Sequence, residues 1–76
     1  MQNLGQVQVN KFTTIIGIVE DAPIKIKRRL LELGLTAGQK VKVLRRSLAG
    51  GVLLVEVRGY TLSLRRESAK WIEVAK

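Results

Sequence analysis

The feature that most limits the fold of this chain is a set of three short strand-like segments between residues 40 and 65. In the first and third segments apolar residues alternate with polar ones, which is typical of strands with one buried face, and the second segment, 52–58, lies between them. Glycines separate the segments, with Gly50 and Gly51 in the first connection and Gly59 in the second. Segments this short, with connections this tight, predict three antiparallel strands joined by hairpins.

Two more strands are expected, one before and one after these three in the sequence. Residues 12–19 are rich in β-branched side chains, and Gly17 within them indicates a bulge or bend. After one helical turn near residues 66–70, the segment 71–74 has room for a final short strand. The first ten residues alternate only weakly, so residues 1–11 are expected to form either a frayed leader or an edge strand.

One short helix is expected between the first and second strands, at about residues 24–33. The apolar residues of this segment recur at the spacing of one helical face, and the basic residues fall on the other side. The residues expected to face the core are Ile24, Ile26, Leu30, Leu31 and Leu33.

Both ends of this helix have recognisable signals. At the start, Asp21 is expected to accept from free backbone N–H groups, and Pro23 is expected in the first turn, where its missing N–H matters least. At the end, Gly34 is expected in the left-handed conformation, and Leu35 is expected to fold back onto Leu30 as a hydrophobic cap.

These elements predict an all-β fold of about five strands with one short helix and one helical turn. A chain of 76 residues is too short to cover an open sheet with further layers. Closing the sheet on itself protects its edges. We therefore expect a small SH3-like barrel that forms a single domain over residues 1–76.

The absence of histidine and cysteine narrows the function classes. It removes imidazole and thiolate metal sites and the nucleophile pairs that depend on these side chains. We therefore expect no enzymatic activity and no cofactor. Glu20 and Asp21 form the one adjacent pair of acids. Two carboxylates alone would hold a hard cation weakly, so we expect solvated surface acids there rather than a metal site.

The charge balance of 14 basic against 6 acidic residues, a net charge of +8, favours polyanionic partners. Lys42, Arg45 and Arg46 lie on one predicted strand and are expected to line one face of the barrel together with other basic residues. Such a face either keeps the barrel soluble or contacts nucleic-acid phosphates. The chain has few aromatic residues to stack on bases, which favours the first interpretation.

The chain shows neither the pattern of a signal peptide nor an apolar run long enough to cross a bilayer. We therefore expect a soluble, cytoplasmic protein without membrane insertion.

Two motifs resemble a known family. The first is the helix exit, which reads Arg-Leu-Leu-Glu-Leu-Gly-Leu-Thr-Ala-Gly over residues 29–38. The second is Arg-Gly-Tyr-Thr-Leu-Ser-Leu-Arg over residues 58–65. In this order and at this spacing, they resemble the ferrous iron transport protein A (FeoA) family, and the resemblance covers about residues 14–74.

The resemblance implies an SH3-like barrel, which agrees with the strand pattern. It also implies a cytoplasmic accessory protein of bacterial ferrous iron uptake that contacts the GTPase portion of the FeoB membrane transporter. Similar domains stand at the C-terminus of DtxR-type repressors, where they serve as interaction modules. The alternatives are a small basic barrel that binds nucleic acid and a module that senses or binds iron.

The contact residues for such a partner are expected on the exposed side of the helix, on the basic strand and in the loop after it. They are Lys25, Arg28, Arg29, Lys42, Arg45, Arg46 and Leu48. We expect a monomer or a weak homo-oligomer.

Overall fold

The computed structural model describes residues 2–47 and 49–75, which form one six-stranded sheet and three helical segments. The strands are β1 (Gln2–Asn3), β2 (Phe12–Ile18), β3 (Lys40–Arg46), β4 (Val52–Val57), β5 (Tyr60–Arg65) and β6 (Ile72–Val74). The helical segments are the 3-10 turn η1 (Leu4–Gln6) and the helices α1 (Ile24–Glu32) and α2 (Arg66–Ala69).

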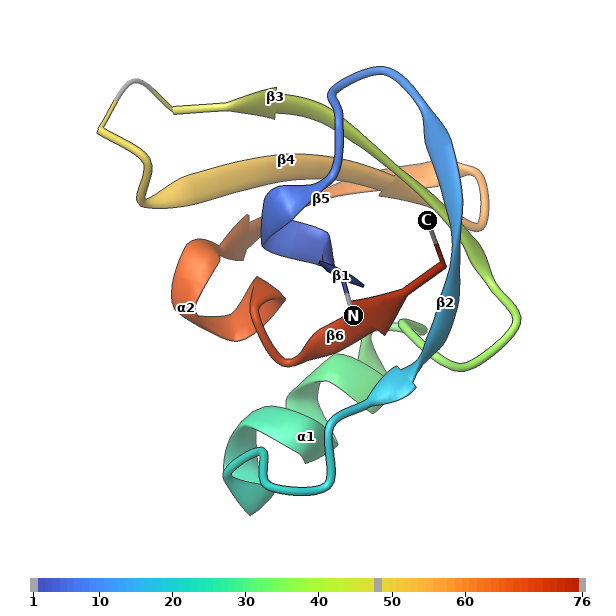
Figure 1. Cartoon of the computed structure of the whole chain (residues 1–76), viewed down its shortest axis with the longest axis vertical. Coiled ribbons are helices and arrows are strands. Elements are labelled where there is room, and N and C mark those ends of the chain that lie inside the picture. Colours follow the sequence, from blue (N-terminus) through green and yellow to red (C-terminus); the bar gives the residue numbers. More distant parts are fainter. Residues whose placement is uncertain (1, 48, 76) are drawn as a thin grey trace.

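The sheet has the order β1-β6-β2-β3-β4-β5, and all its ladders are antiparallel. It curls around a central core, with α1 at one end of the molecule (Figure 1). The expected all-β architecture with one short helix is confirmed, with one more strand than expected. The sheet is not closed, because no ladder in the described part of the chain joins β1 to β5. Strand β5 therefore keeps one free edge.

The core is built from alternate residues of the strands, as the sequence pattern predicts. Val41, Val43, Val55 and Val57 on β3 and β4 are all buried, and Leu64 on β5 lies beside them. The same core cluster includes Leu30 of α1, Leu35 just after that helix, Ala69 of α2, and Ile72 and Val74 of β6.

The N-terminal segment packs into the fold rather than forming a frayed leader. Gln2 and Asn3 pair with β6, so the edge-strand interpretation holds for these two residues. The Asn3 side chain then accepts from the Gly5 N–H at 2.9 Å, and the Gln6 side chain accepts from the Asn3 N–H at 3.0 Å. This reciprocal cap turns the chain so that Leu4 enters the core.

The C-terminal end of α1 has the expected glycine exit. Gly34 has a φ of +88°, and its N–H donates to the Leu31 carbonyl at 3.0 Å. The Leu35 N–H donates to the Leu30 carbonyl at 3.1 Å, which completes a Schellman motif. Leu30 and Leu35 are both buried in the same core, so the expected hydrophobic cap is confirmed.

The N-terminal end of α1 differs from the expectation. Pro23 is the residue just before the helix, and no side chain accepts from the first-turn N–H groups, so Asp21 does not cap the helix. Ile24 and Leu31 point outward, with 64% and 45% of their surfaces exposed, whereas Ile26 and Leu33 pack against the core. The buried stripe of α1 is narrower than its hydrophobicity suggests, because one small sheet offers little surface for a helix to cover.

Candidate interaction surface

The outward side of α1 presents apolar and basic side chains together. Ile24, Arg28 and Leu31 follow one another at spacings of four and three residues, so they form one stripe, which we call the outer stripe. All three are exposed. Two large apolar side chains on either side of a cation are costly to leave in water and suit a partner surface that is apolar and acidic.

Lys25 and Arg29 lie on the side of α1 that faces β5. They line a groove between the helix and the strand, with Ile26 and Leu33 in its floor. From the strand side, Ser63, Leu64 and Arg65 contribute to the same groove. The three predicted helix residues therefore fall on two neighbouring surfaces, Arg28 on the outer stripe and the other two on what we call the α1–β5 groove.

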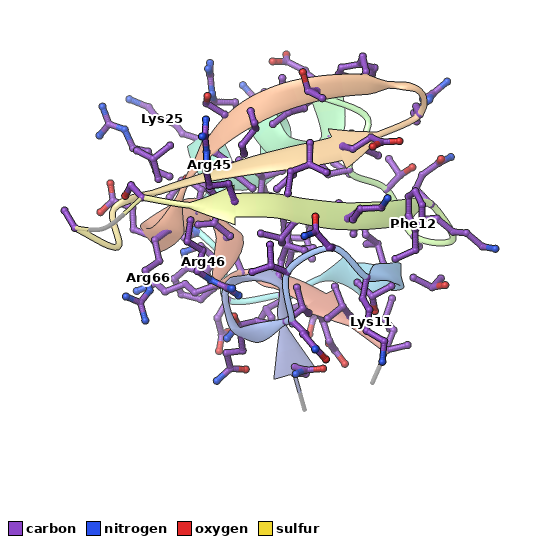
Figure 2. The ribbon with its side chains drawn as sticks, turned by 90° about the horizontal axis from the view of Figure 1, so that it is seen from above. Lys11, Phe12, Lys25, Arg45, Arg46 and Arg66 are labelled. Carbon is purple, nitrogen blue, oxygen red and sulfur yellow. The ribbon has the colours of Figure 1, made fainter. Side chains whose placement is uncertain are left out.

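The predicted basic strand residues do not share one face. Figure 2 shows Arg45 and Arg46 leaving β3 in different directions. A bulge at Leu44 separates the pair Val43–Val55 from the pair Arg45–Leu54. Beyond the bulge, Arg46 pairs with Leu53, which is buried, and so lies on the inner side of the sheet.

The guanidinium of Arg46 holds the N-terminal segment in place. Its Nη2 donates to the Gly5 carbonyl at 3.1 Å and also to the Val7 carbonyl. Both carbonyls belong to η1 and the chain just after it, where no strand ladder satisfies them. The expectation that Lys42, Arg45 and Arg46 line one face of the barrel therefore does not hold for Arg46, which lies on the inner side of the sheet and whose Nη2 bonds two backbone carbonyls.

Lys42 and Arg45 remain on the outer face of the sheet. The Lys42 Nζ lies 4.4 Å from the centroid of the exposed Phe12 ring, a cation–π contact across the β2–β3 ladder. Arg45 is exposed and pairs with Leu54 of β4. Neither of these two cations lines the α1–β5 groove.

The remaining sequence predictions concern Leu48 and the acidic pair. Leu48 lies outside the described residues. Glu20 and Asp21 are exposed in the turn that precedes α1. Within residues 2–47 and 49–75, no group of three or more Asp, Glu, His or Cys residues gathers around them or elsewhere.

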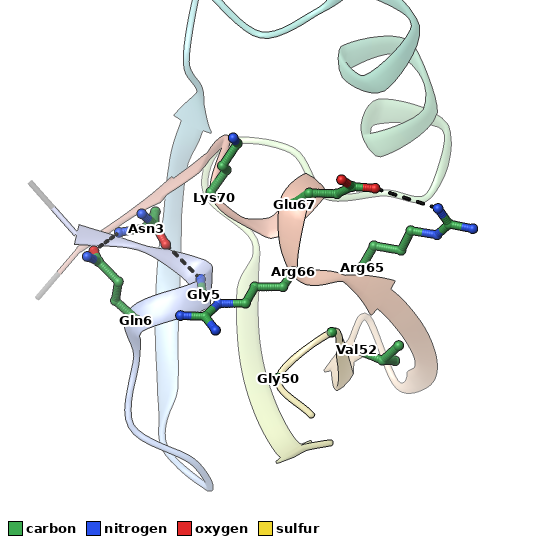
Figure 3. Close-up of a pocket in the computed structure, with 10 residues that line it drawn as sticks. Asn3, Gly5, Gln6, Gly50, Val52, Arg65, Arg66, Glu67 and Lys70 are labelled. Atoms are coloured by element: carbon green, nitrogen blue, oxygen red, sulfur yellow. Dashed lines mark hydrogen bonds and ion pairs between the residues drawn. The ribbon is translucent and has the colours of Figure 1, made fainter. Parts of the chain in front are cut away.

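A second pocket lies between the two end strands of the sheet, β1 and β5, which do not pair with each other. We call this place the open seam. Figure 3 shows Arg66 reaching from α2 toward Gly5, while Arg65 turns to the other side and pairs with Glu67 at 3.6 Å. Gly50 makes room for Arg66, since a Cβ at Gly50 would come within 3.1 Å of its Nη1. This arrangement was not predictable from the sequence, because Gly5, Gly50 and Arg66 come from η1, the loop before β4 and α2.

Tyr60 is another residue whose role the sequence pattern did not reveal. Its hydroxyl donates to the Leu33 carbonyl at the end of α1. The bond joins β5 to the helix across 27 positions of sequence.

No helix in the described part of the chain is long and apolar enough to cross a membrane.

Comparison with known proteins agrees with this geometry. Residues 2–76 match the family model of the FeoA domain. No curated protein sequence matches significantly.

Three solved structures illustrate the similarity. An FeoA-like protein from Clostridium acetobutylicum is 30% identical, with a TM-score of 0.86 over 96% of this chain and 83% of its own. The FeoA of Stenotrophomonas maltophilia, solved with zinc, is 28% identical, with a TM-score of 0.84 over 99% of this chain and 91% of its own. That protein is described as a prokaryotic SH3-domain protein and as a candidate ferrous iron transport activating factor. A manganese-dependent transcriptional repressor shares the fold, with a TM-score of 0.85 at 23% identity, over 96% of this chain and 40% of its own. The SH3-like fold expected from the sequence is confirmed.

Proposed function

Since this chain belongs to the FeoA domain family, we propose that it is an accessory protein of bacterial ferrous iron uptake that acts by docking on the cytoplasmic portion of a FeoB-type transporter. The observation that carries this proposal is the outer stripe. Ile24 and Leu31 are large apolar side chains left exposed on either side of Arg28. An isolated fold gains nothing from this exposure, whereas a partner that covers both side chains gains their burial.

The net charge of +8 adds a second, long-range contribution. Cations on and beside α1 attract an acidic partner surface before contact, which raises the rate of association. Docking alters the nucleotide-dependent states of the transporter only when the domain binds one of them more tightly than the others. The proposed mechanism is therefore state-selective binding through α1, on the cytoplasmic side of the membrane.

The test is an NMR titration of the isotope-labelled protein with the cytoplasmic GTPase domain of the transporter from the same organism, at about 0.15 M salt, where loose charge attraction is screened. We expect saturable shifts centred on residues 24–31. Ile24→Glu is expected to weaken binding at least tenfold, about 1.4 kcal/mol, because it replaces an exposed apolar contact by a charge. Ile16→Glu is the matched control, since Ile16 is also exposed, at 52%, but lies on β2.

Absence of saturable shifts would contradict the proposal. A short RNA that shifts the Lys42 and Arg45 amides instead, with an affinity that falls steeply with salt, would favour the nucleic-acid alternative. Stoichiometric Fe²⁺ binding that shifts the Glu20 and Asp21 amides under anaerobic conditions would favour the iron-binding alternative.

A further inference from the structure

Strand β5 has an open edge. It is the last strand in the sheet order and pairs only with β4. The two strands are joined by the residues Arg58 and Gly59, with φ values of +53° and +83°, which is the pattern of a tight type I′ hairpin turn. This turn fixes the register, in which Val57 faces Tyr60 and Leu53 faces Leu64.

The register determines which backbone groups of β5 face away from β4. The Arg66 N–H donates to the Gly51 carbonyl at 3.0 Å, whereas the Val52 carbonyl accepts from Ser47 on the β3 side at 2.9 Å. Bonded and non-bonded pairs alternate along an antiparallel ladder. The N–H and C=O groups of Thr61 and Ser63 and the N–H of Arg65 therefore point to the free edge, and no described residue bonds them. The Arg65 carbonyl is excluded, because Arg65 is the N-cap of α2 and its carbonyl accepts the first bond of that helix.

The free edge opens into the α1–β5 groove. Its floor is apolar, formed by Ile26, Leu33 and Leu64. Its rim is basic, formed by the side chains of Lys25, Arg29 and Arg65. Glu67 is the one acid in the lining, and it already pairs with Arg65 at 3.6 Å. Unpaired strand groups, an apolar floor and a basic rim thus occur together in one place.

We propose that the α1–β5 groove receives an extended segment of a partner protein, which adds to the free edge of β5 as a further strand. The backbone of the segment would pair with Thr61 and Ser63 and with the N–H of Arg65. Its alternate side chains would fall into two sets. Those beside Leu62 and Leu64 meet the apolar floor, and those beside Ser63 and Arg65 meet the cations. The occupant is therefore an acidic segment with apolar residues at every second position. This inference rests on the proposed function only in requiring a protein partner.

Charge disfavours a second copy of this chain as the occupant. Pairing β5 with β5 would bring Arg65 and the rim cations Lys25 and Arg29 of two copies together. Like charges across a ladder are destabilising, and basic residues on an edge strand are a common protection against self-pairing. The same cations attract an acidic strand.

The test uses the labelled full chain and an acetylated, amidated heptapeptide of alternating glutamate and valine, with a lysine–valine peptide as the charge control. At a peptide concentration ten times the dissociation constant, we expect hydrogen exchange at the Ser63 and Arg65 amides to slow about tenfold. The lysine peptide is expected to give no protection. Shifts centred on Arg66 and Lys70 at the open seam, without protection of β5, would overturn the proposal.

Two variants and one modified peptide separate strand pairing from simple charge attraction. Ser63→Pro removes the N–H at the free edge and leaves the β4 ladder intact, so it is expected to weaken binding at least tenfold. Ser63→Ala keeps the N–H and is expected to bind as the parent does. A glutamate–valine peptide N-methylated on the groups that face β5 must also fail to bind, a result that does not depend on how well Ser63→Pro folds. Undiminished binding of the methylated peptide would refute the proposed strand addition.

The transporter domain links this test to the proposed function without merging the two. Binding of the GTPase domain that shifts residues 24–31, with no protection of the β5 amides by the peptide, would support the docking function and overturn the strand addition. Protection of the β5 amides by the peptide, with no binding of the GTPase domain, would support the strand addition and contradict the docking function.

Discussion

The two ends of α1 are held in very different ways. At the C-terminal end, the left-handed Gly34, the buried Leu35 and the hydroxyl of Tyr60 all act on the last turn. At the N-terminal end, Pro23 precedes the helix without a side-chain cap, and Ile24 is 64% exposed. The helix is fixed to the barrel at one end and presents bare surface at the other.

This difference separates residues that hold the fold from residues that are free to bind. Substitutions near Gly34 act on stability, because backbone and core contacts converge there. Substitutions near Ile24 act on recognition, because they touch little of this chain. A docking surface placed beside a firmly held helix end keeps its geometry while its side chains stay available.

The largest effect is expected at the fixed end, from Leu35→Ala. Leu35 has no exposed surface and follows the glycine that ends the helix. Removing its buried side chain leaves a cavity, and such changes cost about 2–5 kcal/mol. Urea unfolding followed by the fluorescence of Trp71 measures this loss. A loss below about 1 kcal/mol would show that the C-terminal end is held less firmly than its contacts indicate.

A smaller loss is expected for Gly34→Ala. The left-handed conformation costs an L-residue roughly 1–2 kcal/mol. A Cβ there would also lie 3.1 Å from the Cδ of Arg58 and 3.3 Å from the Tyr60 hydroxyl oxygen. Gly38→Ala is the matched control, since Gly38 has a φ of +90° but open space around it. Equal losses of unfolding free energy in the two variants would mean that the contacts add nothing at Gly34.

Tyr60→Phe is expected to cost about 1 kcal/mol, the net value of one hydrogen bond. The change removes the hydroxyl that donates to the Leu33 carbonyl and keeps the ring. Denaturant unfolding measures the change in free energy, and the exchange rates of amides in the last turn of α1 report the local effect. An unchanged rate in that turn would remove Tyr60 from the contacts that fix this end.

The smallest effects are expected at the other end. Asp21→Ala and Ile24→Ser should each change the free energy of unfolding by less than about 0.5 kcal/mol, as surface substitutions usually do. A side-chain cap at a helix start is typically worth about 1 kcal/mol, so a loss of that size for Asp21→Ala would reveal a cap in solution. Thermal unfolding of the two variants beside the parent chain decides this.

Local signals in the sequence predicted local structure well. Gly34 and Leu35 were predictable because a Schellman exit depends on six neighbouring residues. Gly17 was read as a bulge or bend, and the β2–β6 register does shift between Ile15 and Gly17. The buried face of β3 followed from the alternation of Val41 and Val43 with Lys40 and Lys42.

The failures concern contacts between distant parts of the chain. Periodicity placed Ile24 and Leu31 on the buried face, since it cannot tell how much of an apolar stripe the rest of the fold will cover. Periodicity also does not show that Arg46 donates to the Gly5 carbonyl, which lies 41 positions away in the sequence. The candidate surfaces were therefore only partly predictable. The sequence shows which residues are basic. Which of these side chains share a surface depends on the bulge in β3 and on the β4–β5 register.

The place of β6 between β1 and β2 has a consequence for biosynthesis. Strand β1, which is synthesised before the other strands of the sheet, pairs only with β6, which is synthesised after them, through Gln2–Val74 and Asn3–Glu73. Until β6 emerges, β1 has no neighbour, and the core lacks Ile72 and Val74. Pairings this distant in sequence form late because closing so long a loop is slow. The domain therefore completes its fold only after β6 has been synthesised, and a chain without β6 would leave the N-terminal segment without its strand partner.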